Sequence, residues 1–249
     1  MSKVLIADKM SPLASRCFET RGIEVDVILG MNVKELIECI GKYEGLAVRS
    51  GTKVTAEVFE AAKKLKVVGR AGIGVDNIDC DMATSKGVVV MNTPFGNSIT
   101  TAEHTISLML AVARQIPAAN VSTHAGKWEK SRFMGIELMG KTLGIIGCGN
   151  IGAVVAERAQ GLKLKVIAYD PYLSSDRAKD LGVEKVELAT LFPRSDIITL
   201  HTPLTDATRK ILKKEAFSQM QDGVLIINCA RGGIVNELCL LFTSPRPRD

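Results

Sequence analysis

KTLGIIGCGNIGAVVAERAQGLKLKVIAYDP, residues 141–171, is the stretch that decides the fold of this chain. Its apolar pattern predicts a strand at 143–146, a glycine turn, an amphipathic helix at 153–162 and a second strand at 165–169. The turn reads Gly-x-Gly-x-x-Gly, and this motif between a strand and a helix is typical of dinucleotide-binding units. Glycines also mark ordinary turns. The flanking strand and helix, with an acid closing the second strand, favour dinucleotide binding over a purely structural turn.

Each glycine of this motif has its own predicted task. Gly147 would permit the tight turn, Gly149 would let the backbone approach a pyrophosphate, and Gly152 would let the helix pack closely on the strand. The N–H groups at the start of the helix would then face the anion. Asp170 ends the second strand, where a carboxylate accepts hydrogen bonds from a ribose 2′-OH and repels a 2′-phosphate. The sequence therefore predicts NAD, rather than NADP, as the cofactor.

The composition is that of an ordinary globular protein. Of the 249 residues, 46% are hydrophobic and 24% are charged, which excludes a disordered or collagen-like chain. The net charge is +5, but Lys and Arg are scattered among Asp and Glu. We therefore expect neither nucleic acid nor a membrane surface as a partner.

Targeting, redox and metal signals point the same way. The start of the chain does not have the pattern of a signal peptide, and no apolar run reaches the length of a membrane span. The six cysteines form no Cys-x-x-Cys pair, which indicates reduced thiols and a cytoplasmic location. The three histidines, His104, His124 and His201, have no ligand-like spacing, so no metal site is expected.

From residue 3 to residue 91, short β-branched runs alternate with helical patterns, which indicates a parallel sheet covered by helices. Two segments that follow expected strands are suited to anions, Arg49-Ser50-Gly51 and the turn Gly72-Ile73-Gly74. An arginine can fork onto a carboxylate or phosphate, and successive N–H groups of a glycine turn can form an anion nest. Each segment alone fits a surface arginine or an ordinary turn equally well.

A proline marks the end of the first lobe. Pro94 cannot continue a sheet ladder, so we place the domain boundary after it. Residues 97–101 offer capping side chains, and from 102 to 116 apolar residues recur with helical period on nearly every side. Such a helix must be buried, either between lobes or between subunits, and we expect a homo-oligomer through this region. His104 on this helix is interpreted as a packed histidine.

The remaining sequence extends the sheet of the second lobe. Strands are predicted at 183–186, 196–200 and 224–228, with helices at 187–192 and from residue 213. With the two strands of the glycine-turn unit, these make five parallel strands of a doubly wound sheet. The loops after the fourth and fifth strands return to the edge that holds the glycine turn, so Thr202 and Arg231 can reach a bound dinucleotide and its substrate.

Five segments in this order resemble the D-isomer-specific 2-hydroxyacid dehydrogenases: GRAGIGVDNID, NTPFGNSITTAEH, GIIGCGNIG, HTPLT and NCARGGIVNE. The resemblance covers residues 1 to about 237 and implies an α/β enzyme of two doubly wound parallel-sheet lobes. Residues 1–94 would form a flavodoxin-like substrate lobe, and 95–237 a Rossmann NAD-binding lobe that is incomplete at its C-terminus. The implied reaction passes hydride from C2 of a D-2-hydroxy acid to NAD.

The resemblance also implies roles for individual residues. Arg231 would be catalytic and would hold the substrate carboxylate. Cofactor contacts are implied for Asn150, Ile151, Asp170, Thr202, Cys229, Ala230 and Arg231, beside Gly147, Gly149 and Gly152 of the turn. Substrate contacts are implied for Arg49, Ser50, Gly72, Ile73 and Gly74. Relatives often carry Thr where Ile73 stands, so only backbone contacts are expected at that position.

The end of the chain departs from the family pattern. The family supplies a Glu and then a His after the arginine loop, and no such pair follows Arg231 here. The reaction needs a base for the hydroxyl proton, and His201 is a weak candidate. Residues 238–249, LCLLFTSPRPRD, predict no helix, and the last eleven resemble the translation of a sequencing-library adapter. We interpret 238–249 as a non-native tail on a truncated, inactive chain; a genuine short isoform is the alternative.

Three other functions stay open at this point. The chain could act on a different D-2-hydroxy acid. It could be an NAD-binding corepressor of the C-terminal-binding-protein type, although those proteins usually carry an extension before the first strand. It could also be a regulatory fragment that pairs with full-length subunits through the 102–116 helix. An acid and a histidine encoded within about fifty codons beyond residue 237 would favour the enzyme.

Overall fold

The computed structural model describes residues 2–243, and the chain divides into two compact units, Met1–Asn97 (unit 1) and Ser98–Asp249 (unit 2). Each unit contains one five-stranded parallel sheet. Within the described residues, every helix is too short or too polar to cross a lipid bilayer. The expected boundary after Pro94 lies three residues before this division.

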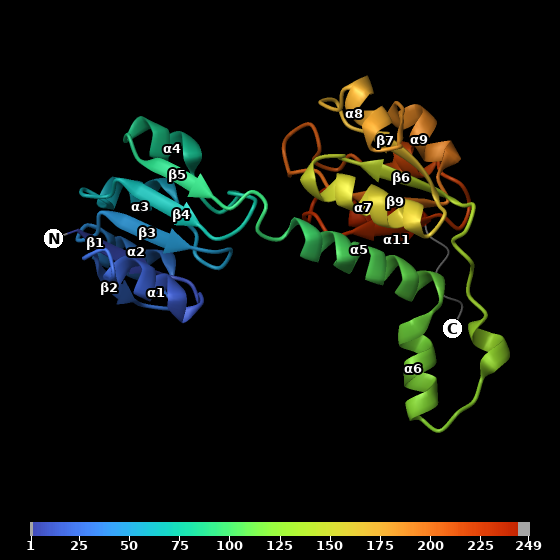
Figure 1. Cartoon of the computed structure of the whole chain (residues 1–249), viewed down its shortest axis with the longest axis horizontal. Coiled ribbons are helices and arrows are strands. Elements are labelled where there is room, and N and C mark those ends of the chain that lie inside the picture. The colour runs from blue at the N-terminus through green and yellow to red at the C-terminus, as the bar shows by residue number, and fades with distance from the viewer. Residues whose placement is uncertain (1, 244–249) are drawn as a thin grey trace. The chain divides into compact units, whose positions relative to one another are not determined.

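Unit 1 is a flavodoxin-like α/β unit, with the strand order β2-β1-β3-β4-β5 (Figure 1). Its elements along the chain are β1 (Lys3–Ile6), α1 (Pro12–Glu19), β2 (Glu24–Val27), α2 (Val33–Ile40), β3 (Gly45–Val48), α3 (Ala56–Ala61), β4 (Val67–Arg70), α4 (Cys80–Ser85) and β5 (Val89–Asn92). The central strand β3 is buried at every position, as expected for a parallel strand with helices on both faces. The predicted fold class is therefore confirmed for this unit.

Helix α2 illustrates how the sequence of unit 1 fixes the start of a helix and its packing on the sheet. The Asn32 side chain accepts hydrogen bonds from the Lys34 and Glu35 N–H groups, and the Glu35 side chain accepts one from the Asn32 N–H. This capping box satisfies N–H groups that the helix itself cannot pair. Leu36 and Ile40 lie one turn apart and are buried in the core, so the helix is held on the sheet by its apolar stripe.

Unit 2 has the Rossmann strand order β10-β9-β6-β7-β8, so the predicted fold class is confirmed here as well. Its elements are α5 (Ser98–Ala113), α6 (Ile116–His124), the 3₁₀ helix η1 (Lys130–Phe133), β6 (Thr142–Ile146), α7 (Asn150–Gly161), β7 (Lys165–Tyr169), α8 (Ser175–Asp180), β8 (Glu184–Lys185), α9 (Leu188–Arg194), β9 (Ile197–Leu200), α10 (Lys214–Phe217), β10 (Leu225–Asn228) and α11 (Glu237–Thr243).

The sheet of unit 2 separates two hydrophobic cores. Alternate residues of a strand point to opposite faces, so Ile145 joins the core formed with α5 and α7, while Ile146 joins the core that includes α9 and α10. Both residues are fully buried. Because β6 is central and covered on both sides, the residues that follow it are placed firmly at the carboxyl edge of the sheet.

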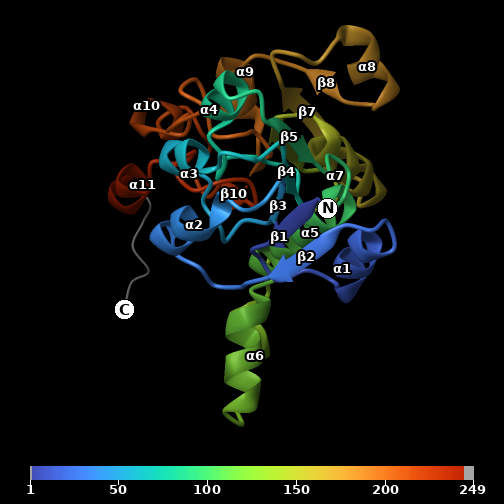
Figure 2. The same ribbon diagram turned by 90° about the vertical axis from the view of Figure 1, so that its left-hand side faces the viewer.

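The single helix predicted for 102–116 is wrong, because the structure has two helices there. Helix α5 ends at Ala113, Gln115 takes a left-handed conformation with φ 53, and α6 begins at Ile116 with Pro117 in its first turn. Figures 1 and 2 both show α6 projecting away from the sheet of unit 2. The chain returns along residues 125–139, where the Ile136 N–H donates to the Ala113 carbonyl at 2.8 Å.

A second expectation, that no helix follows Glu237, is also wrong. Helix α11 covers Glu237–Thr243 and packs beside α10. The LCLL run supplies leucines, which are good helix formers, and Pro245 and Pro247 come only after it. Residues 244–249 of the predicted non-native tail lie outside the described residues.

Candidate functional site

The Gly-x-Gly-x-x-Gly turn lies between β6 and α7, where the packing leaves no room for side chains at two of its glycines. Gly147 has φ +93, which is in the left-handed region that favours glycine. A Cβ on Gly152 would lie 2.2 Å from the Gly147 carbonyl oxygen, whereas a Cβ on Gly149 would meet nothing within 4 Å. The protein therefore uses Gly147 and Gly152 for its own packing, and the space beside Gly149 is open to a ligand.

Asp170, directly after β7, is tied to this turn. Its Oδ2 accepts a hydrogen bond from the Cys148 N–H at 2.8 Å, and its Oδ1 accepts one from the Tyr172 N–H at 2.8 Å. Each carboxylate oxygen has two lone pairs, so each can accept one further hydrogen bond. The carboxylate thus holds the turn in place and retains acceptor capacity for a ligand hydroxyl.

The start of α7 and the loop after β9 complete this edge of the sheet. Asn150 and Ile151 form the first turn of α7, and its N-cap, Gly149, provides no side chain to cap their N–H groups. Thr202 packs on the turn, since a Cβ on Gly147 would lie 2.8 Å from its Cγ2. Its hydroxyl is buried without a hydrogen-bond partner among the described residues. An uncapped helix start and an orphaned hydroxyl fit the phosphate and ribose groups of a dinucleotide.

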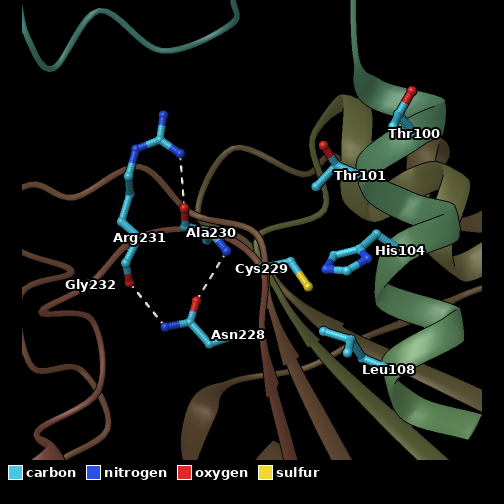
Figure 3. A pocket seen from close by; sticks show the side chains of 9 residues that line it. All are labelled: Thr100, Thr101, His104, Leu108, Asn228, Cys229, Ala230, Arg231 and Gly232. Carbon is cyan, nitrogen blue, oxygen red and sulfur yellow. Dashed lines mark hydrogen bonds between the residues drawn. The ribbon is translucent and has the colours of Figure 1, made fainter. Parts of the chain in front are cut away.

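The loop after β10 faces α5 across a pocket of about 490 Å³. Asn228 shapes this loop, because its Oδ1 accepts from the Ala230 N–H at 3.0 Å and its Nδ2 donates to the Arg231 carbonyl at 2.9 Å. The Arg231 guanidinium donates to the Ala230 carbonyl at 2.9 Å. In Figure 3 Cys229 lies on the side of the loop that faces α5, and the Arg231 side chain extends away from that helix.

The interpretation of His104 as a packed histidine is wrong. His104 is exposed and lines the same pocket, together with Thr100 and Thr101. The buried face of α5 is formed instead by smaller or apolar residues, among them Ala102 and Met109. The threonines were expected only as capping residues. Thr100 and Thr101 lie on the side of α5 that faces the loop after β10. This position could be found only once the start of α5 was known to lie beside that loop.

In unit 1 the predicted substrate residues gather at the carboxyl ends of β3 and β4. Arg49 and Ser50 are exposed directly after β3, and Gly72-Ile73-Gly74 follows β4, its neighbour in the sheet. The Asn92 side chain donates to the Ile73 carbonyl at 2.6 Å, and the Thr93 N–H donates to the Gly72 carbonyl at 3.1 Å. The end of β5 therefore supports the glycine turn of this unit.

His201 is poorly suited to accept a substrate proton. It follows β9, where its Nε2 lies 3.0 Å from the Thr199 hydroxyl and its Nδ1 is buried without a described partner. Burial lowers the pKa of His201 to about 4 because the charged imidazolium loses its hydration. A histidine with that pKa is neutral at pH 7, but it is a weak base.

Comparisons with known proteins bear on both units. Residues 106–243 match the family model described as "D-isomer specific 2-hydroxyacid dehydrogenase, NAD binding domain". The chain is 52% identical to the D-3-phosphoglycerate dehydrogenase of Archaeoglobus fulgidus, over 96% of this chain and 45% of that protein. The chain spans about half the length of the curated relatives it matches.

Solved structures with similar folds include enzymes of more than one specificity. The NAD⁺-bound 3-phosphoglycerate dehydrogenase of Entamoeba histolytica has a TM-score of 0.82 and 32% identity, covering 97% of this chain and 76% of that chain. A glyoxylate reductase of Paecilomyes thermophila has a TM-score of 0.89 and 27% identity, covering 97% of this chain and 77% of that chain. The fold alone therefore does not select the hydroxy acid.

The same added methyl group should have different effects at Gly152 and Gly149 of the turn and at Gly161 at the end of α7. Gly152→Ala should lower stability by about 1–3 kcal/mol, because the methyl overlaps a backbone oxygen. Gly149→Ala should cost no more than about 1 kcal/mol of stability, the N-cap preference for glycine over alanine, because its methyl meets open space. It should weaken NADH binding by about tenfold, because that space is assigned to the ligand. Gly161→Ala, at the C-terminal end of α7, is the matched control: it should leave NADH affinity unchanged and raise stability by no more than about 1 kcal/mol, because alanine is the better helix former. Thermal unfolding and NADH fluorescence titration measure both. Wild-type NADH affinity in Gly149→Ala would contradict the assignment of the turn.

The lowered pKa of His201 predicts acid sensitivity. Because the unfolded chain takes up a proton near pH 6.5 and the folded protein only near pH 4, stability is full above pH 6.5 and is lost as the pH falls toward 4. Between pH 7 and pH 5, the free energy of unfolding should fall by about 2 kcal/mol less in His201→Asn than in the wild type, measured by urea unfolding. His124→Asn, at an exposed histidine, should retain the wild-type loss. Equal losses in wild type and His201→Asn would refute this account.

Proposed function

The chain belongs to the D-isomer-specific 2-hydroxyacid dehydrogenase family, and from this premise we propose that the full-length protein oxidises D-3-phosphoglycerate to 3-phosphohydroxypyruvate with NAD, a reaction of serine biosynthesis. The observation that carries the reaction class is the glycine turn of the NAD-binding domain, with Asp170 bonded to it and open space at Gly149. The choice of hydroxy acid is supported by relatives whose sequences are about 50% identical to this chain and which are named D-3-phosphoglycerate dehydrogenases.

The residues of the chain divide the work between cofactor and substrate. NAD, when bound, accepts the hydride. We assign its pyrophosphate to the start of α7, its ribose to Asp170, and its remaining contacts to Ile151, Thr202 and the loop 229–231. Arg231 holds the substrate carboxylate as a bidentate fork. Arg49, Ser50 and the Gly72-Ile73-Gly74 turn meet the remaining anionic groups of the substrate.

The hydroxyl proton needs a base that His201 does not provide well at neutral pH. The acid–histidine pair that the family resemblance implies is not among the 249 residues, which contain His104, His124 and His201 only. Positioning of the substrate and acid–base catalysis each contribute orders of magnitude to a rate. We therefore propose to test activity on a protein that continues beyond these 249 residues, as the curated relatives do.

Cofactor choice follows from Asp170. Asp170→Ala should weaken NADH binding by about 1–3 kcal/mol, because a charge-assisted hydrogen bond to the ribose and the bond that holds Cys148 are both lost. The affinity for NADPH should fall less or rise, because the repelling carboxylate is gone. Asp176→Ala, at an exposed acid in the first turn of α8, is the matched control. Tighter binding of NADPH than of NADH by the wild-type protein would overturn the assignment.

The proposed reaction is tested by NADH production from D-3-phosphoglycerate in the full-length protein. Arg231→Lys should raise KM sharply and lower kcat, because a single ammonium cannot copy the guanidinium fork. Arg209→Lys, at an exposed arginine, should keep wild-type kinetics. A wild-type protein that oxidises another D-2-hydroxy acid, but not D-3-phosphoglycerate, would contradict the proposed substrate. Unchanged kinetics in Arg231→Lys would remove that arginine from the site.

We also propose that the protein is a cytoplasmic homo-oligomer whose subunits contact one another through α5, α6 and residues 125–139. Large apolar side chains are exposed there, including Val121 at 68%, Trp128 at 83% and Met134 at 76%. Exposed apolar patches of this kind mark association surfaces. Light scattering that reports a monomer at micromolar concentration would contradict the oligomer.

A further inference from the structure

Three side chains from elsewhere in unit 1 bond the backbone of the Arg49–Thr52 segment: Asp8, Asn77 and Arg70, whose Nε donates to the Arg49 carbonyl at 3.3 Å. The Asp8 carboxylate, just after β1, accepts hydrogen bonds from the Arg49 N–H at 2.5 Å and the Thr52 N–H at 3.2 Å. The Asn77 amide donates to the Arg49 carbonyl at 2.7 Å and to the Thr52 carbonyl at 2.6 Å. Both backbone groups of Arg49 and both of Thr52 are therefore bonded by Asp8 and Asn77.

The chemistry of the partners fixes the roles of these side chains. Carbonyl oxygens cannot donate, so the Asn77 atom that lies against two of them must be its nitrogen, and both of its hydrogens are used. N–H groups cannot accept, so they require an acceptor such as the Asp8 carboxylate. Gly51 belongs to the same arrangement, because a Cβ there would lie 2.7 Å from Asp8 Oδ1. The sequence Arg-Ser-Gly is thus shaped around the carboxylate.

The segment that contains Asn77 is itself well anchored. The Val54 N–H donates to the Asn77 carbonyl at 2.8 Å, and the Asp79 N–H donates to the Val54 carbonyl at 2.9 Å. Val54 and Ile78 form a parallel bridge and are buried in the core of unit 1. Asn77 is therefore a fixed point against which the Arg49–Thr52 segment can be held.

We propose that Asp8 and Asn77 are positioning residues that present the Arg49 and Ser50 side chains to the anionic group of the substrate. The backbone groups of Arg49 and Thr52 are engaged, and the Arg49 and Ser50 side chains are exposed; the Arg49 guanidinium also donates to the Lys9 carbonyl at 3.3 Å. A fixed backbone lowers the ordering cost of binding. This inference rests on the proposed function, because it takes D-3-phosphoglycerate as the ligand.

Asn77→Asp is the sharpest test, since it keeps the side-chain shape and turns an oxygen toward two carbonyl oxygens. In the full-length protein it should weaken D-3-phosphoglycerate binding, and raise its KM, by about tenfold or more, with a smaller change in kcat. NADH affinity should stay within about twofold, because Asn77 lies in unit 1, whereas residues 106–243 of unit 2 match the NAD-binding family model. Asp8→Asn retains an acceptor oxygen without the charge, so its loss should be smaller than that of Asp8→Leu.

Two further measurements separate positioning from general damage. Asn32→Asp makes the same chemical change in the same unit at a helix N-cap, where Asp is equally suitable, and should bind D-3-phosphoglycerate as the wild type does. Hydrogen exchange should be faster in Asn77→Asp for the peptide that contains residues 49–52 and unchanged elsewhere in unit 1. This pattern supports the proposal.

The outcomes distinguish this inference from the proposed function. Wild-type binding of D-3-phosphoglycerate with equal binding by Asn77→Asp overturns the positioning role alone. Equal loss of NADH and substrate affinity, or exchange that rises throughout unit 1, also overturns it, since the residue would then be structural. A wild-type protein that does not bind D-3-phosphoglycerate contradicts the proposed substrate, and with it the positioning of that ligand.

Discussion

Helix α7 begins so close to the end of β6 that a single methyl group on Gly152 would overlap the Gly147 carbonyl oxygen. This contact determines where the helix points, because a larger residue would push its first turn away from the sheet. It also places Cys148 where its N–H reaches Asp170 at the end of the neighbouring strand. The opening beside Gly149 and the uncapped start of α7 lie at the same turn, and Thr202 packs on it. The candidate cofactor edge is thus a consequence of backbone packing before any ligand is considered.

Both units solve the same problem at the carboxyl edges of their sheets. Loops that follow parallel strands leave the ladder, so their N–H groups need other partners. In unit 1 Asp8 follows β1 and accepts N–H groups of the Arg49–Thr52 segment. In unit 2 Asp170 follows β7 and accepts the Cys148 N–H. An acid one or two residues beyond a strand therefore orders the loop beside it, and a ligand that meets such a loop finds it already shaped.

The sequence predicts the sheets and the glycine turn well, because those features depend on local pattern. β-branched runs place the strands within one or two residues, and the β7 bounds agree with the prediction of 165–169. The pattern fails where tertiary context decides. The helix predicted for 102–116 divides at a left-handed Gln115, a conformation that no local rule demands of glutamine. The apolar LCLL run lies within α11, because leucine favours a helix and the first proline, Pro245, comes after the last helical residue.

The candidate site divides in the same way. Gly147, Gly152 and Asp170 could be assigned from motif logic, since each has one physical task. Asp8 carried the same signal as Asp170, an acid at the end of a strand, but it lies in no glycine motif. His104 could not be placed on a pocket wall from helical period, because apolar residues surround it on nearly every side in the sequence. The positioning residues Asp8 and Asn77 are far apart in the chain, and no rule of sequence spacing connects them.

The cysteine inside the glycine turn gives the cofactor edge a distinct chemical character. Burial, with a smaller contribution from the nearby Asp170 charge, raises the pKa of the Cys148 thiol to about 11. Thiolates, not thiols, react with peroxides and alkylating agents. At physiological pH this thiol stays protonated and out of reach, while Cys17 lies exposed on the surface of unit 1. Oxidants would therefore reach the exposed Cys17 before the buried thiol of the glycine turn.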